Sequence, residues 1–367
     1  MNYDIVVDMV AFCRGTKRKF LATLLFVHGT LLLFVTIQIS YFYLKTELIG
    51  VKNSYQKQQP PGLIPRIIHQ TWDSTAVPRT FLPWMSSWTR HHPHWQHWFW
   101  TPEDIRCLFR RRYARLAYLY ESYPTQLQRA DVMRYFILHA FGGVYVDLDV
   151  ESLRPLDPLL ANRSCVLSEE PYEHVYILNS LRKANVMNTI MACRPGHALF
   201  KELLANLSQY NSDKNAVNTT GPFYMTSVLT AYFLNRSRAV PRDRSPTDDV
   251  TVLPPKYLLP TFDQHWVLLM EYRCNHTGDT SNPPEFVAVC GNLKRRHYEN
   301  KPSKQAYTNH HWFHVVMKGW SFKRTDTVEI LDVPFETRHG ESHRVRGCVK
   351  TVQVRITISN TFQKLHK

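Results

Sequence analysis

One stretch of the chain constrains the fold more than any other: an apolar helix that leads through two glycines into a strand. In "LQRADVMRYFILHAFGGVYVDLDV", residues 127–150, apolar side chains recur at helical spacing up to Phe141, and Gly142-Gly143 ends the helix. The alternating residues that follow predict a strand, because successive side chains of a strand point to opposite faces. A helix followed so closely by a strand favours an α/β fold.

The alternation divides this strand into an apolar face and a face that carries two acids side by side: Val144, Val146, Leu148 and Val150 against Tyr145, Asp147 and Asp149. Neighbouring carboxylates repel, and burying them unpaired is costly, so a bound cation is the usual reason for such a pair. Oxygen ligands without a cysteine suit Mg²⁺ or Mn²⁺. An Asp-x-Asp pattern also arises by chance in surface loops. Its position at the C-terminal end of a strand, the usual ligand site of open α/β sheets, favours a metal site.

The remaining sequence also reads as alternating strands and helices. "IPRIIHQTW", residues 64–72, predicts the first strand, and residues 101–124 predict a helix with Thr101 as its N-cap and Pro102 in its first turn. Residues 349–359 alternate cleanly enough to predict a strand at a sheet edge. The chain has no internal repeat, so the pattern predicts one α/β domain.

Residues 20–44 predict one membrane-spanning helix. This run contains no Asp, Glu, Lys or Arg, and 25 residues at about 1.5 Å each span about 37 Å, which is enough to cross a bilayer with some tilt. A cleaved signal peptide is the alternative. The run is longer than a typical signal core, however, and no small-x-small cleavage site follows it, so we expect a retained signal anchor.

The flanking charges predict the orientation of this anchor. Four basic residues precede the apolar run, whereas only Lys45 and Lys52 follow it closely, so the positive-inside rule places the N-terminus in the cytosol and the rest in the lumen. Five Asn-x-Ser/Thr sequons agree with a luminal domain, at Asn162, Asn206, Asn218, Asn235 and Asn275.

Six of the seven cysteines would then enter an oxidising compartment. Six cysteines allow fifteen pairings, among which Cys274 with Cys290 is a plausible short loop closure. The chain has no Cys-x-x-Cys, so we do not expect zinc. The predicted divisions are a cytosolic tail, an anchor, a polar stem, a catalytic domain and a C-terminal extension, at residues 1–19, 20–44, 45–63, 64–323 and 324–367.

The composition limits the possible partners. With 44% apolar residues the chain is globular, and a net charge of +15 fits nucleic acid, an anionic membrane surface or a phosphorylated ligand. The basic residues are scattered, without zinc-finger spacing or a basic zipper, so we expect no nucleic-acid partner.

Five segments occur in an order that resembles the glycosyltransferase sugar-binding family with the Asp-x-Asp motif, also called glycosyltransferase family 32. They are "IPRIIHQTW", "RADVMRYFILHAFGGVYVDLDV", "ACRPGHALF", "TGP" and "NHHWFHVVMKGW". The sequence is most similar to the branch of inositol phosphoceramide mannosyltransferases and initiating α-1,6-mannosyltransferases, over roughly residues 64–320. The resemblance implies a GT-A fold (a Rossmann-like mixed sheet flanked by helices), a nucleotide-sugar donor, Mn²⁺ or Mg²⁺, and retention of anomeric configuration.

The resemblance also implies roles for single residues. Asp147 and Asp149 would bind the metal, and Asp131 and Arg134 would lie near the donor ribose and sugar. A structural ion pair is an equally fair role for Asp131 and Arg134, because residues three apart share a helical face.

Three further positions match family residues around the donor. Trp72 would lie against the nucleotide base, although packing of the strand end is at least as good an explanation. Asn188 corresponds to a catalytic-site Asn near the transferred sugar. Gly221, in "TGP", belongs to a turn that shapes the same pocket, although Gly-Pro is also ordinary turn chemistry.

The late block departs from the family pattern. Relatives often end in His-His, a short gap and Ser-Trp, whereas here a longer gap follows the histidines and Gly319-Trp320 replaces Ser-Trp. We expect His311 to be the third metal ligand. A second group of histidines, "HHPHWQH" at residues 91–97, has no partner motif, so we expect it at the surface or in packing.

The sequence thus predicts a single-pass type II Golgi membrane protein with a luminal, metal-dependent, retaining glycosyltransferase domain. The leading expectation is transfer of mannose from GDP-mannose onto a membrane-linked glycolipid, such as inositol phosphoceramide, or onto a glycan. One alternative is a UDP-sugar-dependent α-galactosyl- or α-N-acetylglucosaminyltransferase. The other is a non-catalytic, membrane-anchored sugar-binding protein, against which the intact acid pair argues.

Overall fold

The computed structural model describes Gln38 and residues 64–179, 184–210, 215–238, 248–276, 282–313, 326–329 and 350–351. The chain divides into two compact units, Met1–Val51 and Lys52–Lys367, and all helices and strands named below belong to the second. The predicted tail, anchor (apart from Gln38) and stem lie outside the described residues. No helix within the described ranges is both long and apolar enough to span a bilayer.

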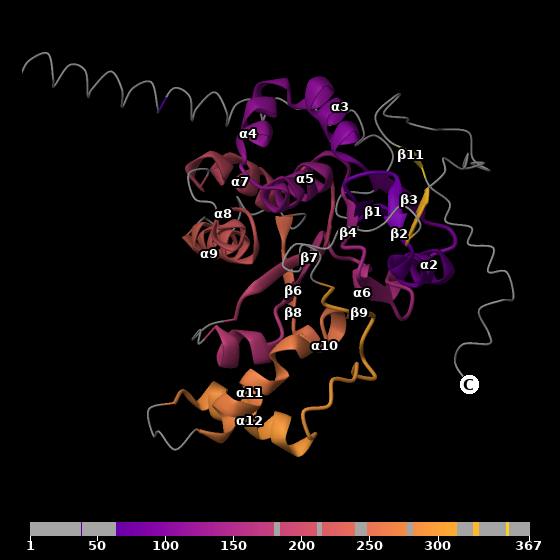
Figure 1. The fold of residues 1–367 in the computed structure, drawn as a ribbon. Coiled ribbons are helices and arrows are strands. Elements are labelled where there is room, and N and C mark those ends of the chain that lie inside the picture. Colours follow the sequence, from indigo (N-terminus) through magenta and orange to yellow (C-terminus); the bar gives the residue numbers. More distant parts are fainter. Residues whose placement is uncertain are drawn as a thin grey trace, which may run out of the picture. The chain divides into compact units, whose positions relative to one another are not determined.

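A seven-stranded mixed sheet forms the centre of the second unit (Figure 1). Its central strand β4 is parallel to β1, which is parallel to β3, whereas β7 runs antiparallel to both β4 and β6. In spatial order the strands are β11 (Lys350–Thr351), β3 (Gln96–Trp100), β1 (Ile67–Thr71), β4 (Gly143–Val146), β7 (Val186–Cys193), β6 (Cys165–Glu169) and β8 (Thr251–Leu253).

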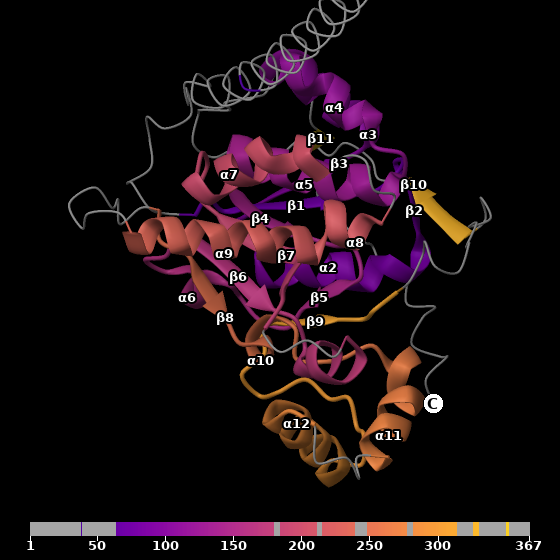
Figure 2. The same ribbon diagram turned by 90° about the vertical axis from the view of Figure 1, so that its left-hand side faces the viewer.

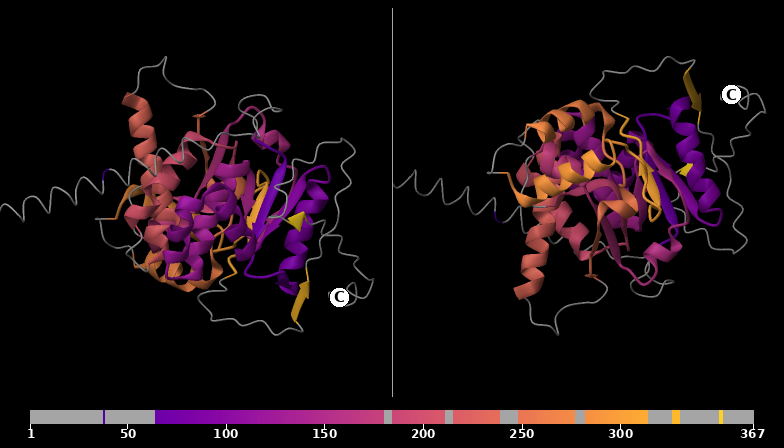
Figure 3. Two further views of the ribbon diagram at one scale, coloured as in Figure 1. Left: turned by 90° about the horizontal axis from the view of Figure 1, so that it is seen from above. Right: turned by 90° about the horizontal axis from the view of Figure 1, so that it is seen from below.

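Helices flank this sheet, which confirms the predicted α/β fold with a mixed sheet. Figure 2 shows one group of helices lying over the sheet, and the views from above and below in Figure 3 show the same layering. This group comprises α5 (Gln126–Phe141), α7 (Ala198–Asn206), α8 (Ala216–Thr219) and α9 (Pro222–Arg238). On the opposite side α2 (Leu82–His91) packs against β5 (Val150–Ser152), and α6 (Asp157–Leu160) follows β5 in the chain.

Smaller elements complete the unit. Two short antiparallel pairs join β2 (Ala76–Pro78) to β10 (Thr327–Glu329) and β5 to β9 (Thr308–His310). Below the sheet in Figure 1, α11 (Val267–Asn275) and α12 (Pro284–Arg295) follow α10 (Pro255–Leu258) and pack on a π-helical turn, η3 (Glu173–Leu178). The disulfide Cys274–Cys290 joins α11 to α12, as predicted. Of the strand predicted over residues 349–359, the structure describes only the two residues of β11, which pair with β3.

The predicted helix over residues 101–124 is instead broken into three pieces. It begins as expected, because the Thr101 side chain and Asp104 form a capping box in front of α3 (Pro102–Arg112). The helix ends before Tyr113, and the chain continues as η2 (Ala114–Leu116) and α4 (Ala117–Ser122). The break lets the fully buried Tyr113 ring pack under α5, where its hydroxyl lies 2.7 Å from Nδ1 of His139.

The glycine pair after α5 is required by both backbone conformation and space. Gly142 and Gly143 have φ angles of +63° and +96°, which disfavour any residue with a Cβ. A Cβ on Gly143 would also lie 2.5 Å from the carbonyl oxygen of Ile67 in β1. These glycines therefore let α5 turn directly into a strand that pairs with β1, as predicted.

The acid pair itself lies in a turn, so the prediction of one continuous strand through Val150 is wrong. β4 ends at Val146, the backbone N–H of Val150 donates to the Asp147 carbonyl (3.2 Å), and β5 begins at Val150. The turn sends Leu148 into a cluster with Phe81, Met85 and other residues, away from the main core that holds the three valines of this segment. Two separate apolar clusters therefore fix the turn from both sides.

Candidate functional site

The candidate site lies where β4 ends and β7 begins. These strands are antiparallel, so residues early in β7 meet the C-terminal end of β4. The backbone N–H of Asp147 donates to the carbonyl oxygen of Thr189 (3.0 Å), which extends the pairing one residue beyond β4. The acid pair thus occupies the C-terminal edge of the sheet, as predicted.

Asp147 is held in place by three side chains. The hydroxyl of Tyr145 donates to Oδ1 (2.7 Å), the hydroxyl of Thr189 donates to Oδ2 (2.7 Å), and Nη1 of Arg134 lies 3.4 Å from Oδ1. Tyr145 is itself fixed, since its hydroxyl lies 3.1 Å from that of Thr71. The Asp147 side chain still keeps 25% of its surface exposed. Its orientation is therefore set before any ligand arrives.

Two predicted donor-binding residues, Asp131 and Arg134, and the predicted catalytic residue Asn188 form one buried network behind Asp147. Arg134 contacts Oδ1 of Asp131 through Nη2 (3.1 Å), donates from Nη1 to the carbonyl of Asn188 (2.9 Å) and lies over the ring of Tyr145. Asp131 also accepts from the Asn188 amide (2.8 Å) and the Thr220 hydroxyl (3.0 Å). Burial raises the pKa of Asp131 to about 6, against the opposing charge of Arg134. Because both charged side chains are only 6% exposed, the geometry favours their structural role: they orient Asp147.

Asp149 is bound by the C-terminal part of the domain. Its Oδ2 accepts from the backbone N–H of Phe313 (2.8 Å) and lies 3.1 Å from Nε2 of His310. Burial alone would raise the pKa of Asp149, but the charge of His310 and these hydrogen bonds hold the pKa below its ordinary value. Burial alone would lower the pKa of His310, but the neighbouring Asp149 carboxylate raises this pKa above its ordinary value. Asp149 and His310 therefore form an ion pair.

The structure places the two adjacent histidines on different partners. His310 reaches Asp149, whereas Nε2 of His311 lies 3.0 Å from Oε2 of Glu151, and its ring stacks on Trp84 at 4.2 Å. Only the backbone of His311 contacts Asp149, whose carbonyl accepts its N–H (2.9 Å). The side chain of His311, expected as the third metal ligand, is thus not brought to the acid pair. Adjacent residues of an extended chain point in opposite directions, so only one of the two histidines can face the acid pair. The sequence alone does not show which one.

The other two predicted positions lie at the margin. Trp72 is half-buried; its backbone N–H donates to the carbonyl of Trp100 (3.1 Å), and its ring meets the edge of Phe81 at 5.2 Å. Gly221 caps the turn between α8 and α9, where a Cβ would lie 3.0 Å from the carbonyl oxygen of Ala216. Its neighbour Thr220, whose hydroxyl binds Asp131, is the residue of this turn that reaches the network.

The donor set at the acid pair fits a divalent cation in chemical type. Two carboxylates and an imidazole are ligands that suit Mn²⁺ or Mg²⁺ with open positions for phosphate oxygens. Both His310 and the backbone N–H of Phe313 contact Oδ2 of Asp149. Among the described residues, no side chain forms a hydrogen bond or ion pair with the other oxygen, Oδ1. Ligand atoms of Asp147, Asp149 and His310 do not all lie within 4.8 Å of one another, because the two acids are drawn toward different partners.

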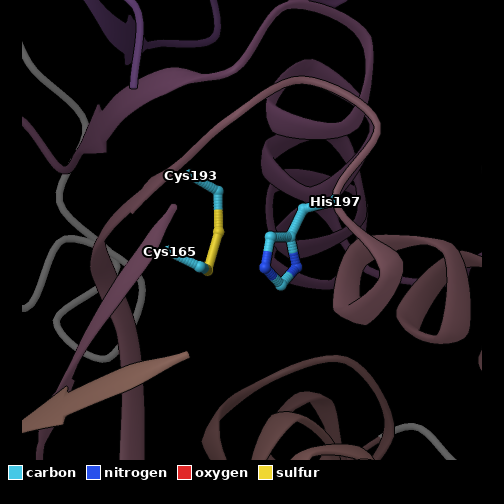
Figure 4. Close-up of side chains that lie close together, drawn as sticks. All are labelled: Cys165, Cys193 and His197. Carbon is cyan, nitrogen blue, oxygen red and sulfur yellow. A yellow bond between two sulfur atoms is a disulfide. The ribbon is translucent and has the colours of Figure 1, made fainter. Parts of the chain in front are cut away.

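A second potential ligand group, Cys165, Cys193 and His197, does come within 4.8 Å (Figure 4). The cysteines face each other directly across β6 and β7 and are joined by a disulfide. Nδ1 of His197 accepts from the backbone N–H of Leu199 at the start of α7 (3.1 Å). With both thiols in the disulfide, this group offers no thiolate to a metal.

Of the early histidines, His92 and His97 are buried and His94 is exposed, as expected for packing and surface positions. His92 is buried between Trp88 and Trp95, its Nδ1 lies 3.1 Å from the Trp88 carbonyl, and its Nε2 accepts from the backbone N–H of Leu156 (3.0 Å). Burial lowers the pKa of His92 to about 4, which agrees with a neutral structural histidine.

Comparison with known proteins confirms the family resemblance. Residues 78–166 match the family model described as "Glycosyltransferase sugar-binding region containing DXD motif". The chain is 31% identical over 219 residues to "Inositol phosphoceramide mannosyltransferase 3" of Schizosaccharomyces pombe, covering 58% of this chain and 56% of that protein. It is 30% identical over 185 residues to "Mannosyl phosphorylinositol ceramide synthase CSH1" of Saccharomyces cerevisiae, covering 49% and 46%.

More distant matches have related descriptions. "Initiation-specific alpha-1,6-mannosyltransferase" of Candida albicans is 24% identical over 216 residues, covering 49% of this chain and 55% of that protein. Among solved structures, "PaToxG Glycosyltransferase" is similar with a TM-score of 0.34 and 14% identity, covering 54% of this chain and 84% of that one. The chain spans about half the length of the curated relatives it matches.

Proposed function

We propose that this chain is a retaining glycosyltransferase of GT-A fold that moves mannose from GDP-mannose onto a membrane-linked glycolipid acceptor. Its residues 78–166 match the glycosyltransferase sugar-binding region with the Asp-x-Asp motif. The curated relatives named as inositol phosphoceramide mannosyltransferases support this choice of sugar and acceptor. The observation that carries the proposal is the acid pair at the end of β4, oriented by Arg134 on one side and by His310 on the other.

The proposed cofactor is Mn²⁺ or Mg²⁺, which would be held by Asp147 and Asp149 with His310 as the third ligand in place of His311. His310 would have to lose the proton of its ion pair with Asp149 when the ion binds, because only a neutral imidazole ligates a metal. When bound, the ion would supply Lewis-acid stabilisation of the negative charge that develops on the departing nucleotide diphosphate. The remaining contribution comes from the protein. The Tyr145 and Thr189 hydroxyls and Arg134 hold the Asp147 carboxylate at the edge of the sheet, which lowers the entropic cost of positioning this ligand.

The proposed location is the Golgi membrane, with the described domain in the lumen and one N-terminal helix as the anchor. Two disulfides among the described residues, Cys165–Cys193 and Cys274–Cys290, support an oxidising compartment. Four of the five sequon asparagines are exposed, which leaves room for glycans at Asn162, Asn218, Asn235 and Asn275.

A donor screen tests the proposal. The full-length protein in detergent would be incubated with Mn²⁺, inositol phosphoceramide and GDP-mannose, UDP-galactose or UDP-N-acetylglucosamine, and nucleotide release and product mass would be measured. We expect a lipid product one hexose heavier from GDP-mannose. Product from a UDP-sugar would move the donor assignment to that sugar. Absence of transfer from all three donors, to this lipid and to mannosylated glycans, would favour the non-catalytic sugar-binding alternative.

A further inference from the structure

A second polar group lies beside the acid pair and has no part in the proposed metal site. It consists of Glu151, His311 and Trp84, hereafter the Glu151 group. Nε2 of His311 lies 3.0 Å from Oε2 of Glu151, and the side chains keep 28% and 34% of their surface exposed, respectively. The imidazole stacks nearly parallel on the indole of Trp84, with ring centroids 4.2 Å apart and an angle of 14°.

An aromatic cluster supports this group from behind. The buried ring of Phe81 lies 5.8 Å from Trp84 and 5.2 Å from Phe313, and Phe313 meets Trp84 edge-on at 6.3 Å. Trp84 and Phe313 are half-buried, so their rings are held in place but not covered. The polar pair is thus presented on a preorganised aromatic surface.

The Glu151 group is joined to the candidate metal site through the backbone. The N–H of His311 donates to the carbonyl of Asp149, and the N–H of Phe313 donates to the Asp149 side chain. Glu151 lies in β5, two residues after Asp149, and pairs with Asn309 of β9. A ligand on this surface would therefore lie next to a donor held at Asp149, without sharing its ligands.

The chemistry of the group selects one kind of ligand. A carboxylate accepts hydrogen bonds from hydroxyls, an imidazole offers a donor or an acceptor, and an aromatic surface covers apolar C–H groups. A diphosphate is disfavoured here, because the Glu151 carboxylate would repel it. The group therefore matches an uncharged hydroxylated ring better than the anionic part of the donor.

We propose that Glu151, His311 and Trp84 bind the hydroxylated ring of the acceptor, either the inositol of a glycolipid or the sugar of a glycan. This proposal rests on the proposed glycosyltransferase function and assigns its acceptor subsite. Glu151 binds ring hydroxyls, His311 fixes the carboxylate and contributes a further polar atom, and Trp84 supports the imidazole.

The test compares acceptor and donor kinetics in the full-length protein, with Glu151→Ala, Glu151→Gln and Glu299→Ala as a matched control. Glu299 is an exposed carboxylate that pairs with Lys301 (2.7 Å), much as Glu151 pairs with His311. It follows α12 in the chain and is not part of the Glu151 group. Loss of charge-assisted hydrogen bonds in Glu151→Ala should raise the acceptor KM about tenfold relative to the donor KM. Glu151→Gln, which keeps one acceptor oxygen, should show a smaller rise, and Glu299→Ala none.

Two acceptor probes, inositol phosphoceramide and methyl α-mannoside, distinguish the lipid ring from a glycan ring, since the KM effect should appear with the one that is the substrate. An unchanged acceptor KM in Glu151→Ala, or an equal rise in the donor KM, overturns the inference. A loss of folding in this variant leaves Glu151→Gln to decide by the same ratio. If the wild-type protein transfers from no donor, the proposed function fails instead, so the two failures are distinguishable.

Discussion

At the scale of the residue, Arg134 neutralises two carboxylates that would otherwise repel each other across the candidate site. It lies between Asp131 and Asp147, is almost completely buried, and donates to a backbone carbonyl as well. A planar guanidinium suits this position, because it offers several donors in a fixed geometry to different acceptors at once. Arg134 thus holds the Asp147 carboxylate in place from an almost completely buried position.

The raised pKa of Asp131 predicts a specific pH dependence of stability. Its folded pKa of about 6 exceeds the ordinary value of 3.8 for an aspartate, so the folded state binds this proton more tightly than the unfolded state. The contribution therefore stabilises the fold at pH values near 4 and is lost as pH rises through 6. It corresponds to a change on the order of 3 kcal/mol at most. Urea titrations at several pH values should show this slope in the wild type and a weaker slope in Asp131→Asn; equal slopes would contradict it.

Replacing the second acid tests the proposed metal site. Asp149→Asn keeps the shape of the side chain but removes its negative charge, so transfer activity should fall at least about a hundredfold while the protein still folds. Its thermal stability should also fall, because His310 loses the charge of its buried partner. The matched control Asp157→Asn removes an exposed carboxylate that pairs with Arg66, and its activity should stay near wild type. EDTA should abolish wild-type activity, and Mn²⁺ should restore it. Undiminished turnover in EDTA would remove the metal from the proposal.

At the scale of the element, local signals predicted beginnings and ends where a side chain satisfies the backbone. The Thr101 N-cap and the glycine pair are such signals, since each acts within a few residues. The break at Tyr113 and the turn at Asp147–Asp149 were missed because distant contacts impose them. The sequence identified both acids and the late histidines. It did not show that His310 faces Asp149, because this contact follows from the pairing of β5 with β9, which are far apart in the chain.

The glycine turn gives a prediction with a built-in control. In Gly143→Ala the new methyl group would meet the Ile67 carbonyl at 2.5 Å in a left-handed backbone conformation, so the protein should lose more than about 2 kcal/mol of stability. Gly291→Ala lies within α12, where the nearest atom would be 3.6 Å away, and should stabilise the helix by roughly 0.5–1 kcal/mol. Chemical denaturation measures both changes. A mild effect at Gly143 would contradict the proposed need for a glycine there.

At the scale of the whole molecule, the family match covers only part of the arrangement around the acid pair. The matched region, residues 78–166, covers α2, α5 and the acid turn but none of β7 or β9. Asn188, Thr220 and His310 therefore come from parts of the chain that the family match does not cover. Their roles depend on tertiary contacts over more than fifty residues, which a single sequence does not reveal.

The proposed topology predicts modification of the intact protein. Expressed in cultured eukaryotic cells, the full chain should carry N-glycans, and treatment with a peptide N-glycosidase should shift its mobility on a gel. In sealed microsomes the same domain should resist added protease until detergent opens the vesicles. An unglycosylated, protease-accessible domain would contradict a luminal location.

The hydrogen bond from Phe313 to Asp149 makes the acid pair depend on residues translated long after it. A premature stop codon anywhere between the acid turn and Thr308 would leave the diagnostic motif legible in a transcript while depriving Asp149 of its histidine and its backbone donor. Splice variants or gene fragments of this kind would carry the signature of a transferase, yet their second acid would lack the environment that the intact fold provides.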